Sequence, residues 1–164
     1  MSEEQAAAAG SAEQKQIVIQ KLYVKDISFE APGTPEIFNK EWRPEVNLNL
    51  QTKNTLVGEN LREVVLSVTA EAKLGETTAF LVEVHQAGVF LIAGFNEPET
   101  QQLIGAYCPN MLFPFAREAI TDLVGKGGFP GLLLQPVNFE GLFAKQMEEM
   151  AKAKVESEAT SDKH

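Results

Sequence analysis

"EVVLSVTAEAKL", residues 63 to 74, decides the fold class, because apolar side chains recur at every second position along it. These apolar positions are all even-numbered: Val64, Leu66, Val68, Ala70, Ala72 and Leu74. The odd-numbered positions between them are mostly polar. A period of two places successive side chains on opposite faces of a β-strand. The stretch therefore predicts a strand with one dry face and one wet face.

Three more segments have the pattern of strands, namely residues 17–30, 46–52 and 78–93. In the first of them the apolar side chains change phase along the segment: Val18, Leu22 and Val24 come first, followed by Ile27 and Phe29. A change of phase of this kind is typical of a β-bulge, which inserts one extra residue into a strand. We expect that bulge near Lys25 or Asp26.

Short turns around Gly58 and Gly75 join neighbouring segments, and Gly88 predicts a bend inside the fourth one. Neither turn has room for a crossover helix, so the sheet is predicted to be antiparallel. Helical patterns follow over residues 98–107, from Pro109 to the glycine-rich stretch at 125–131, and from the N-cap Asn138 onward. The predicted fold is α+β, with a four-stranded antiparallel sheet followed by long C-terminal helices.

Composition predicts one domain, residues 15–150, between an N-terminal tail (1–14) and a flexible C-terminal tail (151–164). The formal net charge of −9 argues against nucleic acid and anionic membranes as partners. No stretch reaches the roughly 18 apolar residues that cross a bilayer, and the N-terminus lacks the pattern of a secretory signal. We therefore expect a cytoplasmic protein with no direct membrane insertion.

Catalytic chemistry has one candidate, the single cysteine Cys108, which precedes Pro109 at the expected start of a helix. A thiol at a helix N-terminus can be activated, whereas a buried thiol behaves as a small apolar side chain. A nucleophile also needs a base, and the two histidines are His85 on a strand and the terminal His164. Because the spacing supports no Cys108–His85 pair and no closed zinc site, the buried interpretation is preferred.

Two groups of residues suggest binding instead. Bulky apolar side chains are more numerous than a small sheet with two helices needs, which favours either a core with an oligomer interface or an open apolar groove. Asp26 and Glu30 on the first strand, and Leu81 and Glu83 on the fourth, would form one acidic patch if those strands pair. The competing interpretation is an ordinary solvated face of the sheet.

Four blocks of this sequence resemble the SecB family of bacterial protein-export chaperones. The blocks, which cover most of residues 16–147 in order, are "DISFEAP" (26–32), "ETTAFLVEV" (76–84), "GAYCPNMLFPFAREAI" (105–120) and "GFPGLLLQPVNF" (128–139). The resemblance implies a homotetramer, built as a dimer of dimers, with no catalytic activity, cofactor or metal. It also implies a chaperone that works without ATP, keeps unfolded preproteins competent for translocation and delivers them to the SecA ATPase of the Sec pathway.

The resemblance also assigns roles to residues. It implies SecA binding by Asp26, Glu30, Leu81 and Glu83. It implies binding of unfolded client chains by Trp42, Leu48, Leu50, Phe139, Phe143 and Met147. The helix after Cys108 is interpreted as an assembly helix, with an oligomer interface at Cys108, Leu112, Ala116, Ala119, Ile120 and Leu123. The alternatives that remain are a small-ligand carrier with a closed apolar pocket and a thiol enzyme using Cys108.

Overall fold

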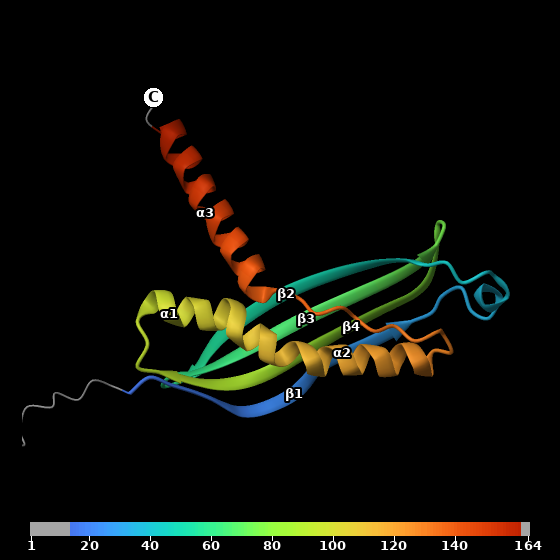
Figure 1. Ribbon diagram of the computed structural model, residues 1–164, viewed down its shortest axis with the longest axis horizontal. Coiled ribbons are helices and arrows are strands. Elements are labelled where there is room, and N and C mark those ends of the chain that lie inside the picture. The colour runs from blue at the N-terminus through green and yellow to red at the C-terminus, as the bar shows by residue number, and fades with distance from the viewer. Residues whose placement is uncertain (1–13, 162–164) are drawn as a thin grey trace, which may run out of the picture.

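The computed structural model describes residues 14–161, and its sheet has the four strands that the sequence predicts (Figure 1). The strands are β1 (Gln16–Glu30), β2 (Glu45–Gly58), β3 (Leu61–Leu74) and β4 (Thr77–Ala93). Their order in the sheet is β1-β4-β3-β2, and every neighbouring pair is antiparallel. The predicted antiparallel α+β fold is confirmed. The predicted N-terminal tail falls almost wholly outside the described residues.

Strand β1 contains two bulges rather than one. The register shifts between Val24 and Asp26, as the sequence predicts, and also between Ile19 and Lys21. The second bulge changes which side chains share a face. Val18 pairs with Leu91 and lies on the face opposite to Leu22, so grouping Val18 with Leu22 and Val24 was wrong. Each extra residue reverses the alternation that follows it.

Residues 97–126 form one continuous helical run, where the sequence predicts two helices. Helix α1 (Glu97–Gln102) leads through a π-helical turn, η2 (Leu103–Tyr107), into α2 (Cys108–Lys126). Asn96 caps the start, because its side chain accepts a hydrogen bond from the backbone N–H of Glu99. The run ends as predicted in the glycine-rich stretch, where Gly128 has a φ of +84°.

Helix α2 lies across β4 and β3 and covers one face of the sheet, the inner face (Figure 1). The even-numbered side chains of β3 point into this layer, and Val64, Leu66 and Val68 are fully buried, as the period of two predicts. Gly88 keeps its pairing with both neighbouring strands. A Cβ atom at Gly88 would lie 3.2 Å from Cδ2 of Leu112, so the missing side chain makes room for α2.

Helix α3 (Phe139–Ser161) begins at the predicted cap, where Asn138 Oδ1 accepts a hydrogen bond from the backbone N–H of Gly141. The segment between α2 and α3 returns along α2 to the base of α3, which then projects from the body (Figure 1). The helix continues to Ser161, whereas the sequence assigned residues 151–164 to a flexible tail. A short 3₁₀ turn, η1 (Glu36–Asn39), lies between β1 and β2.

Candidate functional site

The four acidic-patch residues come together on the face of the sheet that points away from α2, the outer face. Because β1 pairs with β4, Glu30 lies opposite Leu81 and Ser28 lies opposite Glu83. Asp26 lies opposite His85, one pleat further along. Partners across a strand pair share a face, so the four predicted residues form one surface. We call Asp26, Glu30, Leu81 and Glu83 the acidic strand surface.

The nearby Lys25 does not neutralise the carboxylates of the acidic strand surface. Lys25 belongs to β1, as Asp26 and Glu30 do, but it forms its ion pair with Glu63 of β3, and the Lys25 Nζ to Glu63 Oε1 distance is 2.7 Å. Tyr23 donates its hydroxyl to the same glutamate. Hydrogen bonds from Lys25 and Tyr23 lower the pKa of Glu63, so this carboxylate stays ionised and neutralises the lysine. Glu83 has a single close partner on the surface, His85 Nε2.

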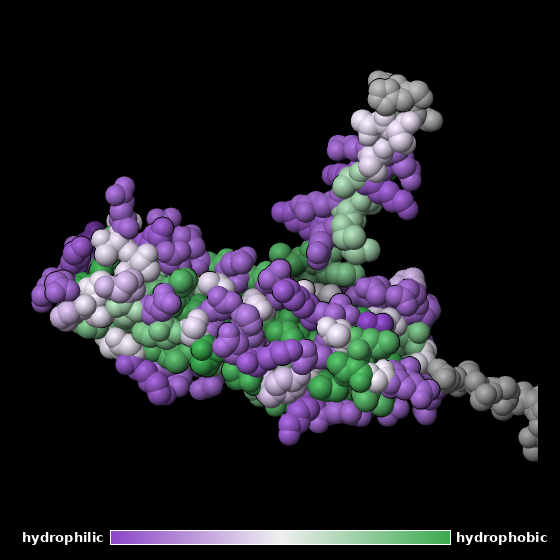
Figure 2. Space-filling model, turned by 180° about the vertical axis from the view of Figure 1, so that it is seen from behind, coloured by the Kyte–Doolittle hydropathy of each residue, from purple (hydrophilic) through white to green (hydrophobic). Residues whose placement is uncertain are grey.

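Viewed from behind, the body shows hydrophilic residues with hydrophobic ones between them, and α3 stands clear of it (Figure 2). On the outer face, the polar side chains of β1 and β4 are continued by polar side chains of β3. Thr69 lies opposite Glu83, and Glu71 lies opposite Leu81 on β3. The acidic strand surface is therefore part of a broad polar area.

An aromatic hollow of about 410 Å³ lies at the end of the sheet next to η1. Phe38, Trp42 and Phe129 line it, with ring centroids 5.1 Å apart for Phe38–Phe129 and 5.5 Å apart for Trp42–Phe129. Phe38 is 49% exposed, although it belongs to this cluster. Aromatic rings that are held in place and still exposed offer a large apolar contact area at little entropic cost.

A second depression, of about 620 Å³, runs between β2, the helical run and α3. We call it the α3 groove. Its apolar lining comes from three elements: Leu50 of β2, Ile104 of η2, and Phe139, Leu142, Phe143, Met147 and Met150 of α3. Met147 is 46% exposed and Met150 is 60% exposed. Flexible methionine side chains let such a surface adapt to different apolar groups.

The edge strand β2 connects the two depressions. Trp42 stacks on Phe80, with ring centroids 6.4 Å apart. Phe80 of β4 lies opposite Ala72 of β3, and Ala72 in turn lies opposite Val46 of β2, so these residues form one row across the sheet. Val46 and Leu48 are 38% and 42% exposed, because α2 packs mainly on β4 and β3 rather than on β2. Their side chains continue on the inner face to Leu50, which lines the α3 groove. The apolar surface is thus long and open.

The structure brings together four of the six side chains predicted to bind client chains, since Leu50, Phe139, Phe143 and Met147 line the α3 groove. Trp42 lies in the aromatic hollow, and Leu48 lies on β2 between the two depressions. Phe38 and Phe129 belong to the excess of bulky apolar side chains that the sequence shows, but neither was assigned to the client-binding set. The sequence could not show that the two rings meet, because they lie far apart along the chain.

Cys108 has no access to a substrate. Its side chain is fully buried, and burial raises the pKa of the thiol to about 12. The residue also lies inside the continuous helical run, where its backbone N–H bonds to the carbonyl of Leu103. It therefore lacks the free helix N-terminus that would activate a thiolate.

Four of the residues predicted for the oligomer interface are fully buried by the chain's own sheet: Cys108, Leu112, Ala116 and Ile120. Such side chains present no surface to a second copy, because they already form the core of this one. The opposite side of the helical run carries exposed apolar side chains, since Tyr107 at the end of η2 is 39% exposed and Phe115 of α2 is 47% exposed. Ala119 and Leu123 remain partly exposed.

Among residues 14–161, no three His, Cys, Asp or Glu side chains gather closely enough to hold a metal ion. Within the same part of the chain, no helix has both the length and the apolar character needed to cross a membrane.

Comparison with known families finds one match that spans most of the chain. The family model described as preprotein translocase subunit SecB matches residues 10–150. A Nitrosococcus oceani protein named protein-export protein SecB is 59% identical over 143 residues, which cover 86% of this chain and 87% of that protein. A Marinobacter nauticus protein of the same name is 47% identical over 160 residues, covering 96% and 97% of the two chains.

Among solved structures, a Mycobacterium tuberculosis SecB-like chaperone in complex with a ChAD peptide from an antitoxin is similar, with a TM-score of 0.57. The similarity covers 74% of this chain and 90% of that one, at 15% sequence identity. Similarity at this level of identity shows a shared fold.

Proposed function

This chain belongs to the SecB family, whose members act as chaperones in preprotein export, and we propose that it holds unfolded preproteins on its apolar depressions and delivers them to SecA through its acidic strand surface. The aromatic hollow, β2 and the α3 groove supply the client-binding side chains. Within this proposal, the client-binding role that the resemblance implies is kept by Trp42, Leu48, Leu50, Phe139, Phe143 and Met147, and Phe38 and Phe129 join them.

One observation carries this proposal: the apolar depressions and the acidic strand surface lie on opposite faces of the same sheet. Leu48 and Leu50 share the inner face with the core residues Ala70 and Val68, whereas Glu30, Leu81 and Glu83 lie on the outer face. A client chain and a docking partner can therefore be bound at the same time. Delivery requires such a ternary complex.

Client holding needs no catalysis. A protein that binds an unfolded chain but not its folded form shifts the folding equilibrium toward the unfolded state. Each apolar contact is weak, but several contacts along one long chain raise the effective concentration for the next. Chains that fold quickly bury their apolar segments before capture, so slow-folding preproteins are retained preferentially.

Docking through the acidic strand surface is electrostatic and brief. Exposed carboxylates attract a basic partner and speed its association, but they bury little apolar area. Leu81 supplies an apolar contact between Glu30 and Glu83. We therefore expect the complex with SecA to weaken as salt concentration rises.

A pair of variants separates the two activities. Glu83→Lys should raise the Kd for SecA by roughly tenfold, which is about 1.4 kcal/mol, and leave the holding of an unfolded preprotein unchanged. Trp42→Ala should weaken client holding and leave SecA binding unchanged. The readouts are titration calorimetry with SecA and the delayed refolding of a denatured preprotein.

Glu59→Lys is the matched control, since it makes the same charge change at an exposed position in the turn between β2 and β3, away from the acidic strand surface. It should bind SecA like the unmodified protein. Equal loss of SecA binding in Glu83→Lys and Glu59→Lys would show that net charge alone matters and would contradict docking at the strand surface.

We extend the proposal to a cytoplasmic dimer of dimers. The uncovered side of the helical run, with Tyr107 and Phe115, supports an interface with a second copy. The edge strand β1 supports another, because its outward backbone groups have no strand partner in the described chain and Val24 and Ile27 are 48% and 43% exposed beside it. A lone subunit would leave these apolar side chains in water.

A further inference from the structure

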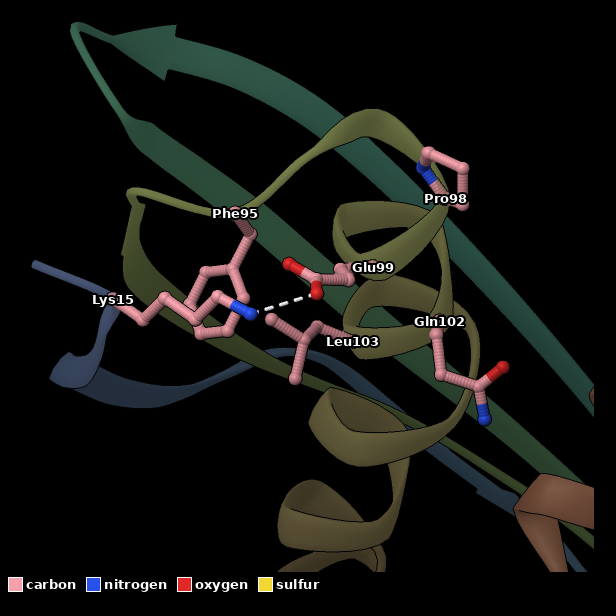
Figure 3. A pocket seen from close by; sticks show the side chains of 6 residues that line it. All are labelled: Lys15, Phe95, Pro98, Glu99, Gln102 and Leu103. Atoms are coloured by element: carbon pink, nitrogen blue, oxygen red, sulfur yellow. Dashed lines mark hydrogen bonds and ion pairs between the residues drawn. The ribbon is translucent and has the colours of Figure 1, made fainter. Parts of the chain in front are cut away.

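A third apolar depression lies beside α1 (Figure 3), at the end of the sheet opposite to the segment between β1 and β2 that contains η1 (Figure 1). It has a volume of about 440 Å³ and is lined by Lys15, Phe95, Pro98, Glu99, Gln102 and Leu103. Phe95 and Leu103 are partly buried and pack against the core, so they give it a fixed apolar floor. We call this depression the end hollow.

Charged groups form only one side of the end hollow. Lys15 Nζ lies 2.7 Å from Glu99 Oε1 and 5.8 Å from the centroid of the Phe95 ring, so the lysine crosses the edge of the ring to reach the glutamate (Figure 3). The Lys15 side chain is 58% exposed. An exposed ion pair of this kind is weakly held and is easily displaced by an incoming group.

The end hollow adjoins the α3 groove through one intermediate depression. That depression, of about 620 Å³, is lined by residues of α1 and α3. It shares Pro98 and Gln102 with the end hollow, and Gln101, Phe143 and Met147 with the α3 groove. Pro98 and Gln102, which lie one helical turn apart, therefore mark the boundary between the end hollow and the intermediate depression, and we call this boundary the Pro98–Gln102 ridge.

We propose that an unfolded client chain bound in the α3 groove continues over the Pro98–Gln102 ridge and places a further apolar side chain in the end hollow. This inference rests on the proposed function and lengthens the same site. The client-binding surface then runs from the aromatic hollow, along β2 and the α3 groove, to the end hollow beside α1, where the helical run begins.

A polypeptide fits this path better than a compact ligand does. The depressions follow one another and are each large enough for one or two side chains, as an extended chain would require. Between them the ridge presents the exposed amide of Gln102, which can donate to and accept from a passing backbone. In Figure 3 this amide points away from the Lys15–Glu99 pair.

Site-specific photo-crosslinking tests the path in the full-length protein. A photoreactive phenylalanine analogue is placed at position 102, at position 147 as a reference within the α3 groove, and at position 118 on the exposed side of α2 as a negative control. The probe is a reduced, unfolded preprotein. We expect client adducts at positions 147 and 102, and none at position 118.

Three other crosslinking results would each contradict the proposed path. Adducts at position 147 without adducts at 102 would overturn the extended path and leave the α3 groove intact as the client site. Adducts at neither position would remove the proposed function together with this inference. If position 102 forms adducts with a second copy of this chain instead of the client, the end hollow is a subunit interface and the inference is overturned.

A conservative variant gives a second readout. Gln102→Glu adds a charge to the exposed ridge without changing the shape of the side chain, and it should raise the Kd for a long unfolded client by roughly three- to tenfold. A short peptide that fills only the α3 groove should bind as before. Gln135→Glu makes the same change at an exposed position that lines none of these depressions. Equal affinity of both variants for the long client would overturn the inference.

Discussion

Burial controls the chemistry that is open to Cys108. The side chain lies between α2 and the sheet with none of its surface exposed, and the pKa of its thiol rises to about 12 because the thiolate would be desolvated there. An unfolded chain ionises the same thiol near its ordinary value of about 9. Ionisation therefore favours the unfolded state as the pH rises from about 9 towards 12, and this thiol's contribution to stability is lost over that range.

We predict that Cys108 does not react with a disulfide reagent such as Ellman's reagent at pH 8 in the folded protein, and that it reacts fully once the chain is unfolded in guanidinium. The thiolate is the reactive species, and the folded protein offers almost none of it. A comparison thiol comes from Asn110→Cys in a Cys108→Ala background, since Asn110 is exposed two residues along the same helix. A native Cys108 that reacts as fast as that thiol would contradict the burial of its side chain.

Single glycines decide how the helices pack. Gly105 lies within the π-helical turn η2, and a Cβ atom built on it would lie 2.2 Å from Cδ2 of Phe143. The absence of a side chain lets the Phe143 ring rest directly on the backbone of the helical run. Helix α3 owes its position at the base of the groove to this contact and to the buried Phe139, whose ring meets Phe113 with centroids 5.7 Å apart.

At the scale of the element, Gly105→Ala should therefore displace Phe143 and loosen the first turns of α3. We expect the free energy of unfolding to fall by about 1–3 kcal/mol, as for other overpacked sites, and client holding to weaken. Denaturant unfolding and refolding-delay assays measure the two effects. Gly125→Ala is the control, because nothing lies within 4 Å of a Cβ atom built there. Indistinguishable behaviour of the two variants would contradict this role for Gly105.

The element scale also shows where sequence patterns stop being informative. The bulge near Lys25 was predictable, because the apolar residues move from even-numbered to odd-numbered positions after it. The bulge between Ile19 and Lys21 was not, because it follows three consecutive apolar residues, in which no alternation is visible. Pro109 suggested the start of a new helix, yet the helix continues through it. A proline in the first turn of α2, directly after the π-helical turn, interrupts less than the sequence pattern suggests.

For the whole molecule, the arrangement of faces explains how one small domain can serve two partners. The inner face carries the helical run, with α2 packed mainly on β4 and β3, and the apolar side chains of β2. The outer face carries the carboxylates. Because a sheet separates the two, a change on one face need not reach the other, and the separation of activities expected for Glu83→Lys and Trp42→Ala depends on this geometry.

Assembly is the prediction that belongs to the whole molecule. Phe115→Glu places a charge on the uncovered apolar side of α2, and we expect it to convert the proposed tetramer to dimers at micromolar concentration, as measured by light scattering. Lys126→Glu also adds negative charge to an exposed position of α2, but at its polar end, and should keep the mass of a tetramer. An unchanged mass for Phe115→Glu would place the interface between copies elsewhere.

The sequence by itself determined the fold class, the four strands and which face of each regular strand is apolar, because these follow from local periodicity, caps and short turns. The family came from the resemblance of four sequence blocks to the SecB family. It also predicted that the first and fourth strands could share an acidic patch. Only the tertiary structure decided that Phe38, Trp42 and Phe129 meet in one hollow, that α2 packs mainly on β4 and β3, and that four of the six predicted interface residues are buried within the chain. Those outcomes depend on contacts between residues far apart in the chain, and no local pattern encodes such contacts.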